Sequence, residues 1–247
     1  DKRVIFINPY EGDKALIGTT DIPYEGAAEK VTADEAEIDY LIAAVNRYFT
    51  QSLRRTDVLE SFSGVRPLYD DGAGNPSAVT RDYVFDLDAT GGPPILNIFG
   101  GKITTFRKLA EHAIQRLAPH FPGLKGDWTA QGTLPGGDLP DGDVAAFMAE
   151  LARHYPWLPR DLARHYLQLY GTRTRDLIGS RQSLEAMGRR FGPLLYESEV
   201  RYLVSREWAE TAEDILWRRT KHRLHMTPTE QADFDEWFTA SDMAKSA

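Results

Sequence analysis

The residues of this chain whose types and spacing are best suited to chemistry surround a glycine pair, Gly100 and Gly101. The apolar run 95–99 before the pair is typical of a buried strand. Lys102 follows, and apolar residues then recur at helical spacing, which predicts a helix that begins near Thr104. A strand, a glycine turn and a helix N-terminus direct free backbone amides and the positive end of the helix dipole to one point. Such a point suits an anion, or a ring that becomes anionic during reaction.

The spacing around the glycine pair excludes a P-loop. Leu96 stands where that motif needs its first glycine, and Ile103 stands where it needs Ser or Thr. The pattern is also not G-x-G-x-x-G. Residue chemistry alone leaves two interpretations open: a contact with an anion or cofactor, or a tight strand-to-helix turn that needs glycine anyway.

Composition limits the classes of protein to consider. The length of 247 residues allows one or two domains, and 42% hydrophobic with 27% charged residues is typical of a soluble globular protein. A net charge of −8 argues against nucleic acid as a partner. The absence of cysteine excludes disulfides, thiolate metal sites and cysteine nucleophiles. No run approaches a membrane span, and the start resembles no signal peptide. Because Asp1 opens the chain without methionine, we expect a fragment whose upstream part is missing.

The first half of the chain mixes predicted strands with helices. The expected strands are 3–8, 15–20, 58–65, 83–87 and 95–99. Turn-rich segments at 9–13 and 70–75 interrupt them. Thr32 and Glu35 form a capping-box pattern, which predicts a helix with an apolar face that extends to Phe49.

The second half predicts helices alone. The Pro- and Gly-rich segment 134–143 is the best linker candidate. The expected helices beyond it are 144–155, 160–170, 197–205, 211–224 and 228–238. Gly171 is a plausible C-cap, and Thr227 with Glu230 forms a second capping box. We therefore predict an α+β fold: a mixed-sheet part of a flavin and substrate domain at 1–133, and an all-helical domain at 139–247.

Several segments, taken in order, resemble one family. They are Ile17–Asp21 (IGTTD), Ser63–Leu68 (SGVRPL), Thr80–Tyr83 (TRDY), Gly100–Thr105 (GGKITT), Leu134–Gly137 (LPGG) and Leu216–Lys221 (LWRRTK). The set is similar to the FAD-dependent glycerol-3-phosphate dehydrogenases of the D-amino-acid-oxidase-like flavoprotein superfamily. The resemblance covers nearly the whole chain but corresponds to the carboxy-terminal half of the family. The family's βαβ unit with G-x-G-x-x-G, which holds the adenosine diphosphate of FAD, is absent from this sequence, so the dinucleotide-binding domain is incomplete.

The resemblance implies an enzyme that oxidises sn-glycerol 3-phosphate to dihydroxyacetone phosphate, with FAD as cofactor and membrane quinone as electron acceptor. It implies a cytoplasmic protein in peripheral contact with the inner face of the membrane, with a second copy of the chain as a further expected partner. We expect the fragment alone to be inactive. The alternative is a non-catalytic helical protein-interaction module, which the missing dinucleotide fingerprint favours.

Arginines are the expected ligands of the substrate phosphate, because a guanidinium can donate two parallel hydrogen bonds to phosphate oxygens. By resemblance, Arg66 and Arg81 are substrate ligands. An edge-strand arginine with its head in solvent is the structural alternative for Arg66. A local ion pair with Asp82 or Asp86 is the alternative for Arg81.

Lys102 resembles the lysine that lies beside flavin and substrate in this family. Reduced flavin carries negative charge at its N1–C2 carbonyl edge, which backbone amides and a nearby cation stabilise. The resemblance therefore implies cofactor contacts from Gly100, Gly101, Lys102, Ile103 and Thr104, with Ile103 acting through its backbone.

The sequence shows no general base, so the catalytic residue stays unknown. His112 and His120 lie too far along the helix after the glycine pair to be persuasive. His222 and His225 are one turn apart, but without a third ligand in sight we expect no metal site.

A basic run follows acidic residues near the end of the chain. The run is Arg218, Arg219, Lys221, His222 and Arg223. A helix from 211 to 224 would place acidic residues near its start and this run near its end, which complements the helix dipole. Attraction to anionic lipid headgroups is the functional alternative.

Overall fold

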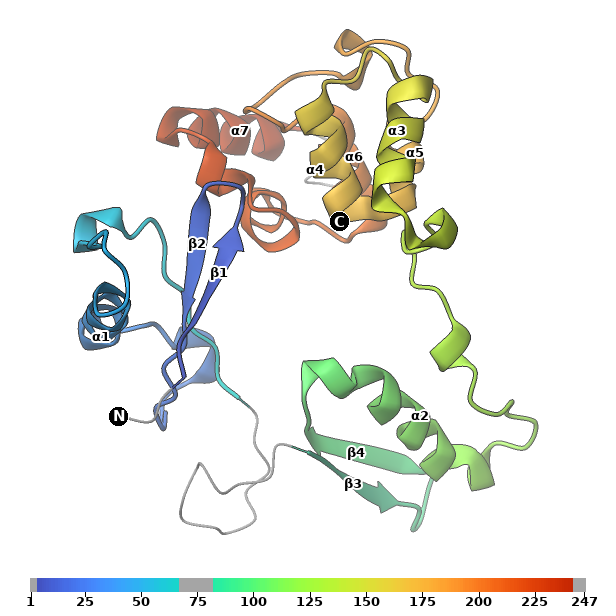
Figure 1. Cartoon of the computed structure of the whole chain (residues 1–247). Coiled ribbons are helices and arrows are strands. Elements are labelled where there is room, and N and C mark those ends of the chain that lie inside the picture. The colour runs from blue at the N-terminus through green and yellow to red at the C-terminus, as the bar shows by residue number, and fades with distance from the viewer. Residues whose placement is uncertain (1–3, 67–81, 242–247) are drawn as a thin grey trace. The chain divides into compact units, whose positions relative to one another are not determined.

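A computed structural model describes residues 4–66 and 82–241 of the chain (Figure 1). The chain divides into two compact units, 1–132 and 133–247. Among the described residues every named strand lies in the first unit, and the second unit is helical. The predicted α+β class is confirmed.

The first unit begins with a two-stranded antiparallel hairpin. Strand β1 (Phe6–Tyr10) pairs with β2 (Lys14–Gly18), so that Phe6 lies opposite Gly18. The hairpin confirms the two strands predicted at the start of the chain, with shifted bounds. Helix α1 (Glu35–Asn46) follows, and its capping box is formed by Asp34 and Glu37. The box predicted at Thr32 and Glu35 was therefore wrong by two residues, because Asp34 directly precedes the helix and is itself a strong N-cap.

A second hairpin supports the glycine pair. Strand β3 (Tyr83–Asp88) pairs antiparallel with β4 (Ile95–Gly100), and Tyr83 lies opposite Gly100. A 3₁₀ turn at Ile103–Thr105 leads into helix α2 (Phe106–Leu117), which contacts β3. The predicted strand–glycine turn–helix unit is confirmed.

The strand predicted at 58–65 was wrong. A 3₁₀ turn at Arg55–Asp57 precedes this segment, and 58–66 has no regular secondary structure. Its apolar side chains are exposed, Phe62 at 69%. A strand needs hydrogen-bonding partners along its backbone, and no described strand pairs with this segment. The predicted loop at 70–75 lies outside the described residues.

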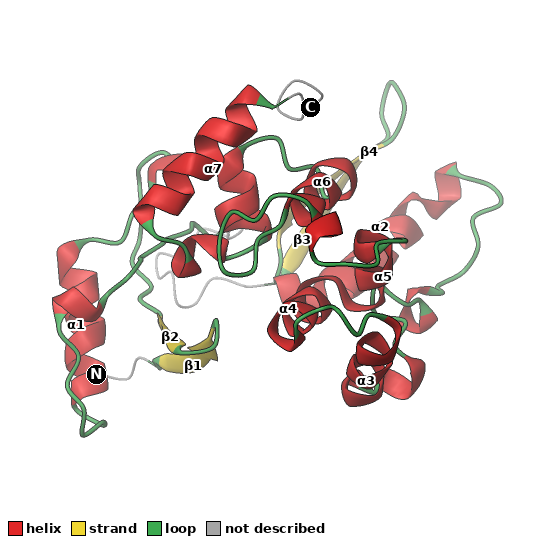
Figure 2. Cartoon of the chain, turned by 90° about the horizontal axis from the view of Figure 1, so that it is seen from above, coloured by secondary structure: helices red, strands yellow, loops and turns green. Residues whose placement is uncertain are grey.

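The second unit is an assembly of short helices (Figures 1 and 2). They enclose a large aromatic and aliphatic core and a smaller buried cluster of Phe147, Leu151 and Leu167. The helices are α3 (Val144–His154), α4 (Arg160–Tyr170), α5 (Thr174–Ile178), α6 (Glu197–Arg206) and α7 (Pro228–Ala240). The capping box of α7 joins Thr227 and Glu230, with Pro228 at the first helical position, as predicted. Gly171 caps α4 with a φ of 56°, which also confirms its predicted role.

The single helix predicted at 211–224 was wrong. A π-helix occupies Asp214–Arg219, Thr220 is extended, and a 3₁₀ turn follows at His222–His225. The buried hydroxyl of Thr220 donates a hydrogen bond to the carbonyl of Ile215, which competes with regular helical pairing. The break directs His222 into the core, where it is 2% exposed.

The segment 134–143 that we predicted as a linker packs onto the end of α4. The carbonyl of Gly136 accepts a hydrogen bond from the amide of Thr172 at 3.0 Å. The Thr172 hydroxyl also donates to Asp138. A Cβ at Gly171 would lie 1.9 Å from the Gly136 oxygen, so only glycine allows this approach. Over 4–66 and 82–241, no helix is long and apolar enough to span a membrane.

Candidate functional site

The glycine pair forms the turn between β4 and α2. Gly100 has a φ of 71° and Gly101 a φ of 100°, in a region that L-residues with side chains rarely adopt. A Cβ at Gly101 would meet the Leu109 side chain at 3.2 Å and the Tyr83 side chain at 3.5 Å. The turn itself therefore requires glycine, and glycine at these positions does not by itself indicate a ligand.

The backbone that follows the glycine pair is suited to bind the anionic edge of a ring. Residues Ile103 and Thr104 open the 3₁₀ turn before α2, so their amides have no carbonyl one turn earlier in the helix. The Ile103 side chain is 87% exposed, and it leaves the first turn open to approach. These amides and the positive helix end suit the negative edge of a reduced flavin, and the local geometry fits that group.

Lys102 lies at the N-terminal end of the same turn. Its carbonyl accepts hydrogen bonds from the amide and the hydroxyl of Thr105, both at 3.0 Å, which fixes its backbone. Its ammonium lies 3.8 Å from Asp82, and about half of its side chain is exposed. At that separation the pair is weak, so the ammonium is available to a stronger anion.

Arg66 lies at the end of the irregular segment 58–66 of the first unit. Its Nη1 donates to Asp21 Oδ2 at 2.6 Å, and both side chains are substantially exposed. The contact joins two of the motifs that carry the family resemblance, 17–21 and 63–68. No hydrogen bond or ion pair among the described residues joins Arg66 to Lys102, and Arg81 lies outside the described residues.

The structure places His112 beside the glycine turn, although sequence reasoning set this residue aside. Helix α2 carries His112 over β3, where its Nδ1 is hydrogen-bonded to the hydroxyl of Tyr83. Tyr83 is the strand partner of Gly100. His112 and Tyr83 therefore form a hydrogen-bonded pair at the edge of the turn, and no described contact gives either group a catalytic role.

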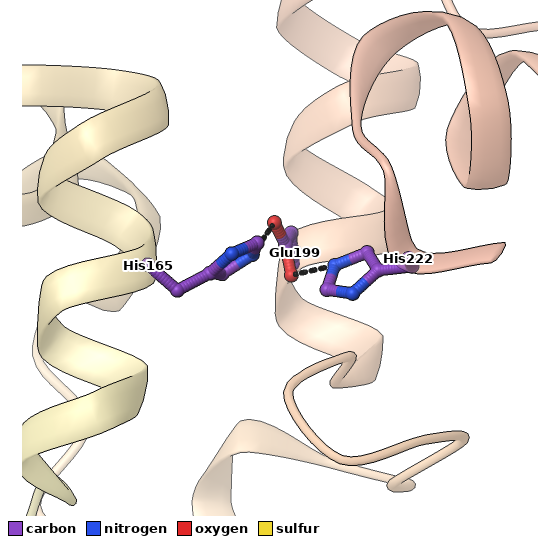
Figure 3. A group of neighbouring side chains, drawn as sticks. All are labelled: His165, Glu199 and His222. Atoms are coloured by element: carbon purple, nitrogen blue, oxygen red, sulfur yellow. Dashed lines mark hydrogen bonds and ion pairs between the residues drawn. The ribbon is translucent and has the colours of Figure 1, made fainter. Parts of the chain in front are cut away.

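A separate group of titratable side chains lies in the helical unit (Figure 3). Glu199 of α6 is completely buried, and its two carboxylate oxygens face two imidazoles. His165 Nε2, from α4, lies 2.8 Å from Oε1, and His222 Nε2 lies 3.1 Å from Oε2. The hydroxyl of Tyr170 donates to Oε1 at 2.6 Å. Three segments separated in sequence thus bring their polar groups to one buried point.

The electrostatics of this group favour a charged carboxylate. Burial alone would raise the pKa of Glu199, but the imidazoles of His222 and His165 lower it to about 2. Burial and the neighbouring Glu199 raise the pKa of the Tyr170 hydroxyl well above its usual range, which keeps Tyr170 a hydrogen-bond donor.

Sequence reasoning missed His165 and Glu199. Both are polar residues on otherwise apolar helix faces, next to Tyr166 and Val200, which are fully buried. Polar positions on a predicted core face are the signal that could have identified them. We expected no third ligand near His222 because we predicted one continuous helix at 211–224. Such a helix would not place His222 in the core, where the structure has it.

Comparison with known proteins defines the class. Residues 1–107 match a family model described as FAD dependent oxidoreductase, and residues 128–233 match one described as the C-terminal domain of alpha-glycerophosphate oxidase. The chain belongs to the FAD-dependent oxidoreductases, and the predicted family and its FAD dependence are confirmed.

Three curated relatives are similar to nearly the whole chain. The chain is 66% identical to the D-erythritol 1-phosphate dehydrogenase of Brucella abortus (strain 2308), over 98% of this chain and 48% of the relative. It is 43% identical to the aerobic glycerol-3-phosphate dehydrogenase of Escherichia coli (strain K12), over 96% of this chain and 47% of the relative. It is 45% identical to the glycerol-3-phosphate dehydrogenase of Pseudomonas aeruginosa, over 96% and 46%. The chain thus spans about half the length of these relatives.

Proposed function

We propose that this chain is the carboxy-terminal part of an FAD-dependent dehydrogenase that oxidises a polyol monophosphate, with D-erythritol 1-phosphate preferred over glycerol 3-phosphate. The observation that carries the preference is 66% identity to a D-erythritol 1-phosphate dehydrogenase, against 43% and 45% to two glycerol-3-phosphate dehydrogenases. The expectation of glycerol 3-phosphate from the sequence is kept as the alternative substrate.

The described residues supply binding and electrostatics in this proposal. Arg66 holds the substrate phosphate, and its contact with Asp21 keeps the guanidinium in place until the dianion competes for it. Arg81 is proposed as a second phosphate ligand on the basis of its motif alone. Lys102 and the amides of Gly100, Gly101, Ile103 and Thr104 stabilise negative charge at the turn before α2. FAD supplies the hydride acceptor when it is bound.

The experiment compares two substrates in the complete enzyme that contains this chain. We expect kcat/KM for D-erythritol 1-phosphate to exceed that for glycerol 3-phosphate by at least about 10-fold, since an added carbon and hydroxyl must be accommodated by contacts in the site. Equal values, or a preference for glycerol 3-phosphate, would contradict the substrate assignment and leave the reaction class intact.

Arg66→Ala tests the phosphate assignment in the same enzyme. Losing a charge-assisted contact to a dianion should lower kcat/KM for both substrates by ~2–4 kcal/mol in transition-state free energy. Arg66→Lys should recover part of the loss, because lysine lacks the planar fork. Arg55→Ala is the matched control, since Arg55 also pairs with a carboxylate, Asp39, at 2.7 Å on the surface of the first unit. An Arg66→Ala enzyme with the kinetics of the control would exclude the substrate role.

We further propose quinone as acceptor and a peripheral position at the inner membrane face, in a homodimer. Trp208 supports the membrane contact: it is 82% exposed and lies next to Arg219, whose guanidinium donates to the Trp208 carbonyl. Exposed tryptophan and arginine suit the headgroup region of a bilayer. Against this, Arg218 is paired with Asp214, so part of the basic run is neutralised internally. Dehydrogenase activity that stays soluble after membrane sedimentation would refute the location.

A further inference from the structure

The buried group around Glu199 has no role in the proposed reaction. It lies in the unit 133–247, whereas Arg66, Lys102 and the glycine turn all lie in the unit 1–132. His165 and His222 are separated from Glu199 by 34 and 23 residues in sequence. The fold places these three side chains together, with their ligand atoms all within 4.8 Å of one another. Among the described residues they are the one such group able to hold a metal ion.

The types of donor favour a transition metal over a hard cation. Two imidazole nitrogens and one carboxylate oxygen suit Zn²⁺ and its neighbours, whereas Mg²⁺ and Ca²⁺ prefer oxygen alone. Sets of three protein ligands of the His₂Glu type bind zinc in proteins, and a water molecule completes the four-coordinate site. Both histidines turn the same atom, Nε2, toward the centre of the group.

Further hydrogen bonds hold the three side chains in place, as is usual for residues that bind a metal. The Tyr170 hydroxyl donates to Glu199 Oε1 and leaves Oε2 to face His222. The hydroxyl of Thr220 accepts a hydrogen bond from the His222 amide at 3.3 Å, which fixes the turn that carries the imidazole. Contacts of this kind orient the side chains that bind a metal directly, and their loss typically weakens metal binding by roughly 10- to 100-fold.

The buried carboxylate at this point is also compatible with a divalent ion. Glu199 is a carboxylate with no exposed surface, and a buried charge is costly unless it is compensated. A divalent ion held by the three ligand atoms would compensate that charge. Tetrahedral zinc, with bonds of about 2.0 Å, sets its ligand atoms about 3.3 Å apart.

We propose that His165, Glu199 and His222 form a binding site for a divalent transition-metal ion, with Zn²⁺ as the preferred ion, that stabilises the helical unit. The site joins α4, α6 and the turn after the π-helix. An ion there ties the segment 220–225 to two helices of the core. The proposed function is structural, because the ion would join three segments of the helical unit's own core.

The test uses the 247-residue chain, freed of metal with a chelator and titrated with zinc chloride by calorimetry. We expect one high-affinity zinc ion per chain, a Kd near or below about 1 μM, and a higher Tm in zinc than in magnesium chloride. His165→Ser should weaken zinc binding by at least about 10-fold, and it is the mildest ligand removal because the His165 side chain is 14% exposed. His154→Ser is the matched control, since His154 lies near Glu150 on the surface of the same unit.

Cobalt provides a readout that a metal-free group of buried hydrogen bonds would not give. The chain has no cysteine, so a thiolate–Co²⁺ absorption band can arise only from an introduced one. His165→Cys keeps a ligand at the site and should show this band with cobalt chloride, whereas His154→Cys should not. Circular dichroism checks that each variant is folded. Zinc binding no tighter than magnesium binding, wild-type affinity in His165→Ser, or the same cobalt spectrum in both cysteine variants would overturn the proposal.

Discussion

The two compact units of this chain bury apolar side chains to very different extents. The unit 133–247 encloses a continuous core that includes Tyr166, Ile215 and Phe234, each with no exposed surface. Among the described residues of 1–132, Val45 is the one buried hydrophobic residue. Large apolar side chains of this first unit, such as Phe6 and Ile95, are instead more than half exposed.

The difference indicates that the first unit relies on further protein surface. Its strands form two separate two-stranded hairpins, and an isolated hairpin is marginally stable in water. Sheets of this kind need a third strand or a packed layer on their apolar face. The chain spans about half the length of the relatives it matches. The second unit, by contrast, contains its own core.

The largest effect should appear when the units are produced separately. We expect residues 133–247 alone to give a cooperative, strongly helical thermal transition, because their core is internal. Residues 1–132 alone should show no cooperative transition and should bind a hydrophobic dye, since their apolar side chains lack cover. Circular dichroism melts and dye fluorescence measure both outcomes.

The starting residue of the helical fragment provides the control. A fragment that begins at 139 lacks Gly136, whose carbonyl accepts the Thr172 amide, so it should melt at a lower temperature than 133–247. A cooperative transition in 1–132, or its absence in 133–247, would overturn the contrast between the units.

Replacing one phenylalanine of each unit by alanine in the 247-residue chain should cost very different amounts of unfolding free energy. Phe234 packs edge-on against Phe191 with ring centroids 5.0 Å apart. Phe234→Ala should cost about 3–5 kcal/mol of unfolding free energy in the helical transition, through lost burial and the cavity left behind. Phe106→Ala, at a site 56% exposed, should cost less than about 0.5 kcal/mol. Urea unfolding followed by circular dichroism gives both values, and similar costs would mean that Phe106 is covered in solution.

Local sequence signals predicted the elements that depend on short-range contacts. The α7 capping box and the β4–glycine–α2 unit were found because Thr227 with Glu230, and Gly100 with Gly101, fix their own backbone. The wrong predictions concern segments whose structure depends on contacts with residues elsewhere in the chain. A strand at 58–65 would need a pairing partner, which the sequence of the segment alone does not specify. Apolar periodicity at 211–224 could not show that the Thr220 hydroxyl interrupts the helix.

The candidate sites divide in the same way. Arg66 and Lys102 were predicted from short motifs that match a family, and their role stays a prediction. The structure adds their ion-pair partners, Asp21 and Asp82. The group at Glu199 could not be found from spacing, because its members come from separate elements and meet only through core packing. His222 alone was noticed, and its predicted neighbour His225 is not one of the three.

The smallest expected effect concerns Glu111, a buried charged residue of the first unit. Its carboxylate accepts hydrogen bonds from Lys108 Nζ at 2.7 Å and Arg107 Nη1 at 2.6 Å, and another from the Thr129 hydroxyl. The Lys108 hydrogen bond, followed by that from Thr129, lowers the pKa of Glu111 from 4.5 to about 2. The contacts join α2 to the 3₁₀ turn at Thr129–Gln131.

A lowered folded-state pKa means that the unfolded state binds the proton more readily. The ionised Glu111 therefore stabilises the local fold fully above pH 4.5, and this contribution declines as the pH falls from 4.5 toward 2. Carbon-13 NMR titration of labelled glutamate carboxyls, with Glu111→Gln to assign the signal, measures the pKa directly. Thr129→Val removes one hydrogen bond and should raise that pKa toward 4.5. If Glu111 titrates near 4.5 in the unmodified chain, α2 and the 129–131 turn are not joined in solution, and the first unit is even less self-supporting than its buried residues indicate.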